Sequence, residues 1–179
     1  MPATTTRQLT ALSTMDALQI HGQLNRRRFS SIAALALAST VLPLRAAPGQ
    51  GHLPLAGALD DQLSAALRQG SPLIVMVSLD GCTFCRMVRE SHLLAMAAQG
   101  LPVVQVDWRS NRALRDFAGA ATTHDGMVRR WGIRVAPTVL FFGPQGREVA
   151  ERMVGSYQPD FYGSYLESRL EQGRRALRG

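Results

Sequence analysis

The sequence predicts an α/β domain, and three observations support this fold class. The unbroken apolar run at residues 73–77 has the length and composition of a strand that is covered on both faces. A helical pattern follows this run and ends at Gln99 and Gly100. A second strand candidate occupies residues 101–107, so strand, helix and strand fall within about 35 residues, the spacing of a βαβ unit.

The elements before this unit are an extended segment and a short helix. Residues 48–57 are rich in proline and glycine, which favours extended chain. Asp60 and Asp61 provide N-cap chemistry for a helix that reaches Gln69, and Gly70 is expected to stop it.

The segment after the βαβ unit is irregular. Residues 108–123 are polar, and we expect at most a short helix around residues 113–117. His124 and Asp125 could cap a further helix through Trp131.

The end of the domain is predicted to be a hairpin followed by a helix. The apolar residues 138–142, the turn at residues 143–146 and residues 148–154 together predict a β-hairpin. Pro159 and Asp160 open a final amphipathic helix. Its expected apolar face consists of Phe161, Tyr165, Leu166 and Leu170.

The two cysteines of the chain, Cys82 and Cys85, follow the first strand directly and begin the helical pattern. Residues three apart on a helix share a face at about 5–6 Å, a separation that a disulfide bridges without strain. At a helix N-terminus the unpaired N–H groups and the helix dipole favour a thiolate, so the pKa of a CxxC cysteine can fall well below its usual value of about 8.5. We therefore expect redox chemistry with Cys82 as the nucleophile.

Charge and composition argue against nucleic-acid binding. The net charge is +7, but residues 1–47 hold five arginines against one aspartate, which leaves an ordinary balance for the rest of the chain. Aromatic residues are few and are not interleaved with the arginines, so a stacking surface for single strands has little support.

No metal site is predicted. A zinc site would need two ligands besides the cysteines at a suitable spacing, and His52, His92 and His124 are not clustered in the sequence. We expect these histidines to face solvent or to cap helices. Copper handling by the two cysteines and one histidine is a minor alternative.

Residues 1–47 are predicted to be an export signal peptide, followed by one domain over residues 48–179. A charged region precedes an uncharged, mostly apolar stretch at residues 30–44, and small residues follow this stretch. The stretch is shorter than the roughly 20 residues that cross a membrane.

The charged region resembles the twin-arginine export signal, because Arg26, Arg27 and Phe29 match that pattern. The ordinary secretory route, an uncleaved membrane anchor and a basic arm on a cytosolic protein stay open as alternatives.

Two distant segments resemble the thioredoxin family. Residues 80–86 carry the CxxC motif, and residues 130–142 resemble the family's segment of an aromatic residue, Gly-Ile-Arg, two residues, proline and a strand. Gly155 also falls where these proteins commonly carry glycine. The resemblance covers residues 73–170 and is closest to exported bacterial proteins such as the SoxW type and the thioredoxin-like domain of DsbC. It implies a thioredoxin-like three-layer α/β/α fold with a mixed central sheet.

The resemblance also implies the roles of individual residues. Cys82 would be the nucleophile and Cys85 the resolving cysteine, and their redox-active disulfide would need no other cofactor. The peptide bond before Pro137 is expected to be cis and to lie beside the cysteine pair, although a strand-start proline is the plain alternative. The residues expected to contact substrate are Thr83, Phe84, Ala136 and Pro137.

One position departs from the family in a way that affects the mechanism. Thioredoxins carry a buried aspartate six residues before the first cysteine, and this chain has Met76 there. Asp80 and Glu90 are nearby carboxylates, and we expect both to be solvated. Arg86 could assist a thiolate or be an ordinary solvated helix residue.

As a whole, the resemblance implies an exported, periplasmic thiol-disulfide oxidoreductase that acts on protein disulfides or dithiols, with reduction as the favoured direction. Such a reductase would need a membrane-embedded electron-transfer partner, because the periplasm is kept oxidising. A monomer is expected, since the chain lacks the separate dimerisation domain of the DsbC isomerase. The alternative is a non-catalytic thioredoxin-fold adaptor or chaperone whose cysteines form a structural disulfide.

Overall fold

The computed structural model describes residues 51–155 and 159–179. The leader predicted at residues 1–47 lies outside the described residues, so its extent stays a prediction. Among the described residues, no helix has both the length and the apolar character of a membrane span.

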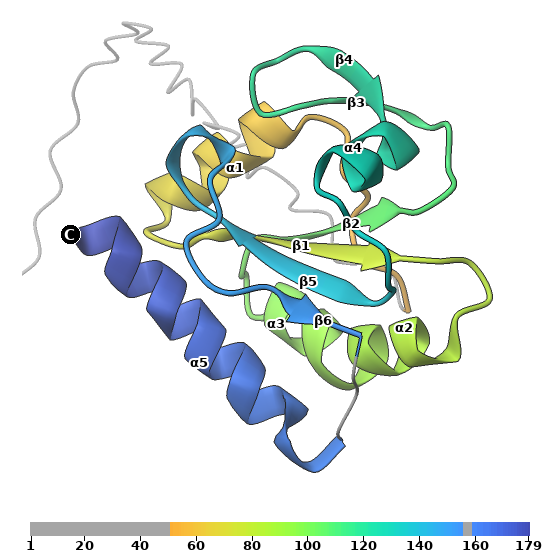
Figure 1. Cartoon of the computed structure of the whole chain (residues 1–179). Coiled ribbons are helices and arrows are strands. Elements are labelled where there is room, and N and C mark those ends of the chain that lie inside the picture. Colours follow the sequence, from red (N-terminus) through yellow and green to blue (C-terminus); the bar gives the residue numbers. More distant parts are fainter. Residues whose placement is uncertain (1–50, 156–158) are drawn as a thin grey trace, which may run out of the picture. The chain divides into compact units, whose positions relative to one another are not determined.

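A four-stranded mixed sheet forms the centre of the domain (Figure 1). In spatial order its strands are β2 (Val103–Asp107), β1 (Leu73–Ser78), β5 (Thr138–Phe142) and β6 (Met153–Val154). β1 is parallel to β2, as the βαβ unit predicted, and antiparallel to β5. β5 and β6 form the predicted antiparallel hairpin, although β6 is shorter than the sequence pattern indicated.

Helices cover both faces of this sheet and give the domain three layers (Figure 1). On one face lie α1 (Leu59–Arg68) and α4 (His124–Arg130). On the other lie α2 (Thr83–Val88), the π-helical turn η1 (Arg89–Leu93), α3 (Leu94–Ala98) and α5 (Pro159–Arg178). The short 3-10 turn η2 (Pro144–Gly146) follows β5. The predicted three-layer α/β/α fold with a mixed sheet is confirmed.

β1 lies at the centre of the hydrophobic core, and all six of its residues are buried. Successive side chains of a strand point to opposite faces. Val75 and Val77 therefore pack with α1 and α4, while Ile74 and Met76 pack with α2, α3 and α5. Burial on both faces is what the unbroken apolar run predicted.

A second, two-stranded sheet stands where the sequence pattern allowed at most a short helix. It consists of β3 (Ala113–Arg115) and β4 (Ala121–Thr123), which pair in an antiparallel manner. The prediction of a helix around residues 113–117 was therefore wrong.

The turn of this small sheet is held by Asp116, which is buried. Its Oδ1 accepts hydrogen bonds from the N–H groups of Ala118 and Ala120, both at 2.9 Å. Its Oδ2 pairs with Arg130 of α4. An aspartate that satisfies the backbone of its own turn favours a hairpin over a helix, and the distant arginine adds a contact that no local pattern reveals.

The acidic residues at the start of α1 do not cap it in the predicted way. The N-cap position is Ala58, which offers no side-chain hydrogen bond. Asp60 and Asp61 lie in the first turn, where negative charge is favourable beside the helix dipole. Both carboxylates pair with Arg115 of β3, so they connect α1 to the small sheet.

The histidine expected to cap α4 or to face solvent is buried instead. The N-cap of α4 is Thr123, whose Oγ1 accepts a hydrogen bond from the N–H of Gly126 at 3.0 Å. The residue that follows it, His124, has an exposed fraction of 0%. The expectation of a capping or solvent-facing role was wrong for this histidine.

The side chain of His124 takes the place of one backbone hydrogen bond between β2 and the chain before α1. The N–H of Gln105 donates to the carbonyl of Pro54, and the N–H of Ala56 donates to the carbonyl of Gln105, both at 2.8 Å. At the next position the imidazole is inserted. Its Nδ1 accepts from the N–H of Asp107 and its Nε2 lies by the carbonyl of Ala56, both at 2.9 Å. The two bonds together require a neutral ring with its proton on Nε2.

α5 buries only part of the predicted apolar face, Leu166 and Leu170, together with Tyr162, which the prediction did not include. Tyr162, Leu166 and Leu170 are buried, whereas Phe161 and Tyr165 have exposed fractions of 58% and 57%. Residues four apart lie on the same helix face, so the buried positions form one continuous row and the two exposed aromatic residues lie beside it.

Candidate functional site

Cys82 occupies the N-cap position of α2, after the loop that follows the carboxyl end of β1. Its Sγ accepts a hydrogen bond from the N–H of Cys85 at 3.1 Å. A sulfur in this position receives an N–H group and the positive end of the helix dipole, and both favour a thiolate once the sulfur is reduced.

Cys82 and Cys85 form a disulfide across one helical turn, with their Cα atoms 5.2 Å apart. The two sulfurs differ in access. Cys85 is buried, with an exposed fraction of 1%, whereas Cys82 is only partly buried. A partner thiol can therefore reach Cys82, while Cys85 faces the core.

The loop before β5 lies against the cysteine pair. The peptide bond between Ala136 and Pro137 is cis, the geometry that the resemblance implied, and Pro137 is buried. The Sγ of Cys82 lies 3.9 Å from the carbonyl oxygen of Ala136. The carbonyl of Pro137 accepts a hydrogen bond from the N–H of Gly155 at 2.8 Å, which holds the loop against the end of β6.

Exposed apolar side chains lie around the accessible sulfur. Phe84, inside the motif, has an exposed fraction of 57%, and Val135, next to Ala136, has one of 45%. Thr83 is exposed as well. A Cβ added to Gly155 would lie only 2.7 Å from Val135, so the end of β6 contacts the loop before β5. Apolar side chains gathered at the surface are typical of a protein-binding site.

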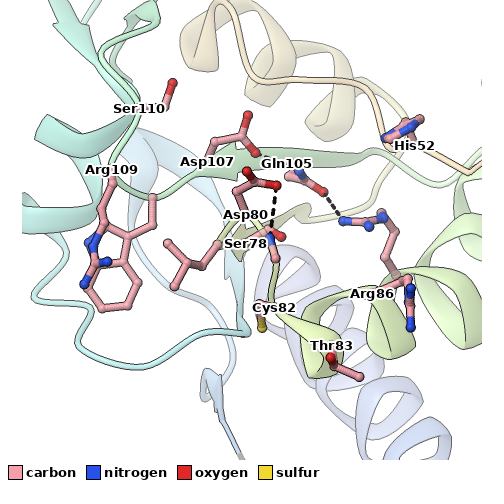
Figure 2. A pocket seen from close by; sticks show the side chains of 14 residues that line it. His52, Ser78, Asp80, Cys82, Thr83, Arg86, Gln105, Asp107, Arg109 and Ser110 are labelled. Atoms are coloured by element: carbon pink, nitrogen blue, oxygen red, sulfur yellow. Dashed lines mark hydrogen bonds between the residues drawn. The ribbon is translucent and has the colours of Figure 1, made fainter.

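A cleft of about 540 Å³ adjoins Cys82 (Figure 2). It lies where β1 and β2 end, because parallel strands bring their carboxyl ends to the same edge of the sheet. The charged and titratable side chains along it are His52, Asp80, Arg86, Arg89, Asp107 and Arg109. A polar cleft thus lies beside the sulfur, in addition to the apolar surface formed by Phe84 and Val135.

A chain of hydrogen bonds runs through this cleft. Nη1 of Arg89 donates to Oε1 of Gln105 at 3.3 Å, and Nε2 of Gln105 donates to Oδ1 of Asp107 at 2.7 Å. In Figure 2, the bond to Arg89 is the dashed line that starts at the side chain labelled Gln105.

None of these three residues was predicted from the sequence to belong to the site. A signal was present for two of them, because Gln105 and Asp107 are polar residues at alternate positions of an otherwise apolar strand. Arg89 begins the π-helical turn that interrupts the predicted helix, and nothing in the local pattern indicated that turn.

The position six residues before Cys82 holds Met76, which is fully buried. Asp80 is exposed and accepts a hydrogen bond from the N–H of Gly81 at 3.0 Å, and Glu90 is exposed too. Both carboxylates are solvated, as predicted. Arg86 is also exposed.

Metal-ligating side chains do not gather in the part of the chain that the structure describes, where no group of three or more His, Cys, Asp or Glu residues could hold an ion.

The sequence matches the family described as a thioredoxin-like domain over residues 59–169, which is more than half of the chain. The chain belongs to this family. The matched residues of this thioredoxin-like domain run from α1 into α5 and include the cysteine pair, the cleft and the cis-proline loop.

Several solved structures resemble this thioredoxin-like domain. The DsbH oxidoreductase is 17% identical, with a TM-score of 0.48 over 68% of this chain and 88% of that one. Thioredoxin O2 from Arabidopsis thaliana is 18% identical, with a TM-score of 0.43 over 68% and 96%. The C-terminal domain of DsbD from Neisseria meningitidis is 17% identical, with a TM-score of 0.43 over 64% and 99%. Similarity at this level concerns the fold. No match to a curated protein was found.

Proposed function

We propose that this protein is an exported thiol-disulfide oxidoreductase that reduces disulfides of other proteins. The observation that carries the proposal is the different access of the two sulfurs in one disulfide: Cys82 is partly exposed at a helix start and Cys85 is buried beneath it. This arrangement suits a nucleophile and a resolving cysteine.

In the proposed reaction, the Cys82 thiolate attacks one sulfur of a substrate disulfide. The substrate S–S bond breaks, a mixed disulfide forms, and the leaving substrate sulfur takes up a proton from water. The Cys85 thiolate then attacks Sγ of Cys82, which releases the second substrate thiol and restores the Cys82–Cys85 disulfide. Two electrons have passed to the substrate, and an external electron donor must reduce the pair again.

The loop before β5 supports the choice of a protein substrate. The carbonyl of Ala136, 3.9 Å from Sγ of Cys82, could accept a backbone hydrogen bond from an extended substrate chain. Thr83, Phe84 and the buried Pro137 complete the proposed binding surface, with the two exposed side chains in reach of a substrate.

The place of action and the partner are part of the same proposal. The twin-arginine-like leader at residues 1–47 would direct the protein to the periplasm, where a membrane-embedded electron-transfer protein would supply the electrons. We propose that the protein acts as a monomer without a further cofactor and that it is of the SoxW or DsbC-domain type.

An insulin reduction assay with dithiothreitol as electron donor tests the proposal. Wild type is expected to accelerate the precipitation of the insulin B chain, and Cys82→Ser should return the rate to that of dithiothreitol alone. After reduction and removal of dithiothreitol, Cys85→Ser should form a mixed disulfide with insulin at Cys82 that mass spectrometry detects. Equal rates for wild type and Cys82→Ser would contradict the proposed catalysis and leave a structural disulfide as the alternative.

The direction of electron flow has its own measurement. Equilibration of the cysteine pair with glutathione gives its reduction potential. A value near about −270 mV would support reduction, and a value near about −120 mV would indicate an oxidase instead.

A further inference from the structure

The cleft beside Cys82 has charges of opposite sign in different places. Figure 2 shows Arg86 and His52 on one side and Asp107, Ser110 and Arg109 toward the other. We call the part formed by Arg86 and Arg89 the arginine side. Both residues come from the helical segment that Cys82 begins, so the arginine side has a defined position relative to the reactive sulfur.

The cations of the arginine side are not neutralised within the described residues. None of the ion pairs found there includes Arg86 or Arg89. Nε of Arg89 is buried and has no hydrogen-bond partner in the described part of the chain. A buried donor without a partner costs free energy, so the groups around Arg89 do not fully satisfy its guanidinium.

Gln105 lies between Arg89 and Asp107, so these two residues do not form an ion pair. Its amide accepts from Arg89 and donates to Asp107, so a neutral group stands between the cation and the anion. An amide holds the guanidinium in place without cancelling its charge. The guanidinium presents several donors in a planar fork, the geometry that matches a carboxylate.

We propose that the arginine side of this cleft binds a carboxylate of the substrate protein, so that Asp or Glu residues next to the attacked cysteine select the substrate. The choice of a disulfide substrate rests on the proposed function. The carboxylate site itself rests on Arg86, Arg89 and Gln105, which take no part in the exchange chemistry. Cys82 borders the same cleft, and a cleft of about 540 Å³ is large enough for the side chains that flank a cysteine.

Binding is tested first, with the full oxidised chain and peptides in which serine replaces the cysteine. Three labelled peptides differ only in the residues on both sides of that serine, which are Glu, Gln or Lys. Fluorescence anisotropy is expected to show binding of the Glu peptide about fivefold tighter than the Gln peptide, with the Lys peptide weakest. The preference should shrink in about 1 M salt, because salt screens exposed charges.

Two variants and one control assign the effect to the arginine side. Arg89→Gln removes the charge. Gln105→Glu places a carboxylate beside Arg89 with almost no change of shape, and it also removes the hydrogen bond that Gln105 donates to Asp107. Both should lower the preference for the Glu peptide to about twofold or less. Arg147→Gln removes an exposed charge at the opposite end of β5 and should keep the wild-type preference. Chemical denaturation would show that all three variants are folded.

Equal binding of the three peptides, or a preference that Arg89→Gln leaves intact, would overturn the inference. The disulfide forms of the same peptides then test the proposed function separately. If wild type reduces none of them faster than Cys82→Ser does, the proposed function fails, whereas the carboxylate site is judged by the binding data alone. If all are reduced and kcat/KM follows the order Glu, Gln, Lys, both hold.

Discussion

We expect the replacement of His124 by leucine to destabilise the fold strongly, although this residue is not part of the proposed active site. Leucine occupies a similar volume but provides neither a donor nor an acceptor. The N–H of Asp107 and the carbonyl of Ala56, each 2.9 Å from the imidazole, would both lose their partner. His124 is fully buried, so water cannot readily take its place.

The magnitude follows from these two groups. Each buried polar group left without a partner costs about 1–3 kcal/mol, so the variant should lose about 2–6 kcal/mol. A domain of this size has a free energy of unfolding of about 5–15 kcal/mol. The loss should therefore be visible in any denaturant titration.

The same histidine predicts a pH dependence. Burial, the main cause, holds the pKa of His124 below its usual value, and the charge of Arg112 acts in the same direction. Protonation would also place an N–H on Nδ1 against the N–H of Asp107. The unfolded chain, with a histidine pKa of about 6.5, takes up the proton first as the pH falls. The stabilisation is complete above about pH 6.5 and is lost below it, by up to about 1.4 kcal/mol per pH unit.

Urea titrations of wild type, His124→Leu and His52→Leu between about pH 8 and about pH 5 measure both effects. His52 is exposed, so its variant is the control for the loss of a surface histidine. Burial also lowers the pKa of His92, but this residue is present in all three proteins, and its contribution cancels in the comparison. A difference between wild type and His124→Leu that is below about 1 kcal/mol, or that does not shrink as the pH falls below about 6.5, would refute the reasoning.

Two further comparisons test the packing by chemical denaturation. Gly146→Ala should cost about 1–3 kcal/mol more than Gly70→Ala, because an added Cβ would lie 2.4 Å from the Phe117 ring at Gly146 and would meet nothing within 4 Å at Gly70. Both glycines have a positive φ, 68° and 66°, so the backbone strain cancels, and equal losses would contradict the contact. Leu166→Ala should cost about 2–5 kcal/mol and Tyr165→Ala less than about 0.5 kcal/mol, since only Leu166 is buried. Comparable large losses for both variants would support the predicted face, which held both residues, and would contradict the observed exposure of Tyr165.

The residues that were predicted wrongly have environments that depend on distant parts of the chain. The sequence pattern of α5 correctly placed Leu166 on the buried face, but only packing against the sheet selects Tyr162 over Phe161 and Tyr165. His124 follows an N-cap residue and begins a helix, a position that usually faces solvent. In the fold, however, the chain before α1 runs along β2, and the imidazole provides the hydrogen-bond partners of Asp107 and Ala56. Local periodicity carries no information on either contact.

The sequence alone determined the features that depend on neighbouring residues. An apolar run of strand length predicted the buried β1, and two cysteines three apart at a strand-to-helix junction predicted a pair that one helical turn can join. The two motifs also identified the family and the expected cis bond before Pro137.

Only the tertiary structure decided what surrounds the accessible sulfur. Arg89 and Gln105 are 16 residues apart in sequence, and Cys82 and Ala136 are 54 apart, yet both pairs meet at one edge of the sheet. The parallel register of β1 and β2 brings the polar end of β2 to the same edge as the CxxC loop. A strand's own pattern specifies which of its residues are buried, but its neighbours and their register are set by the packing of the whole domain.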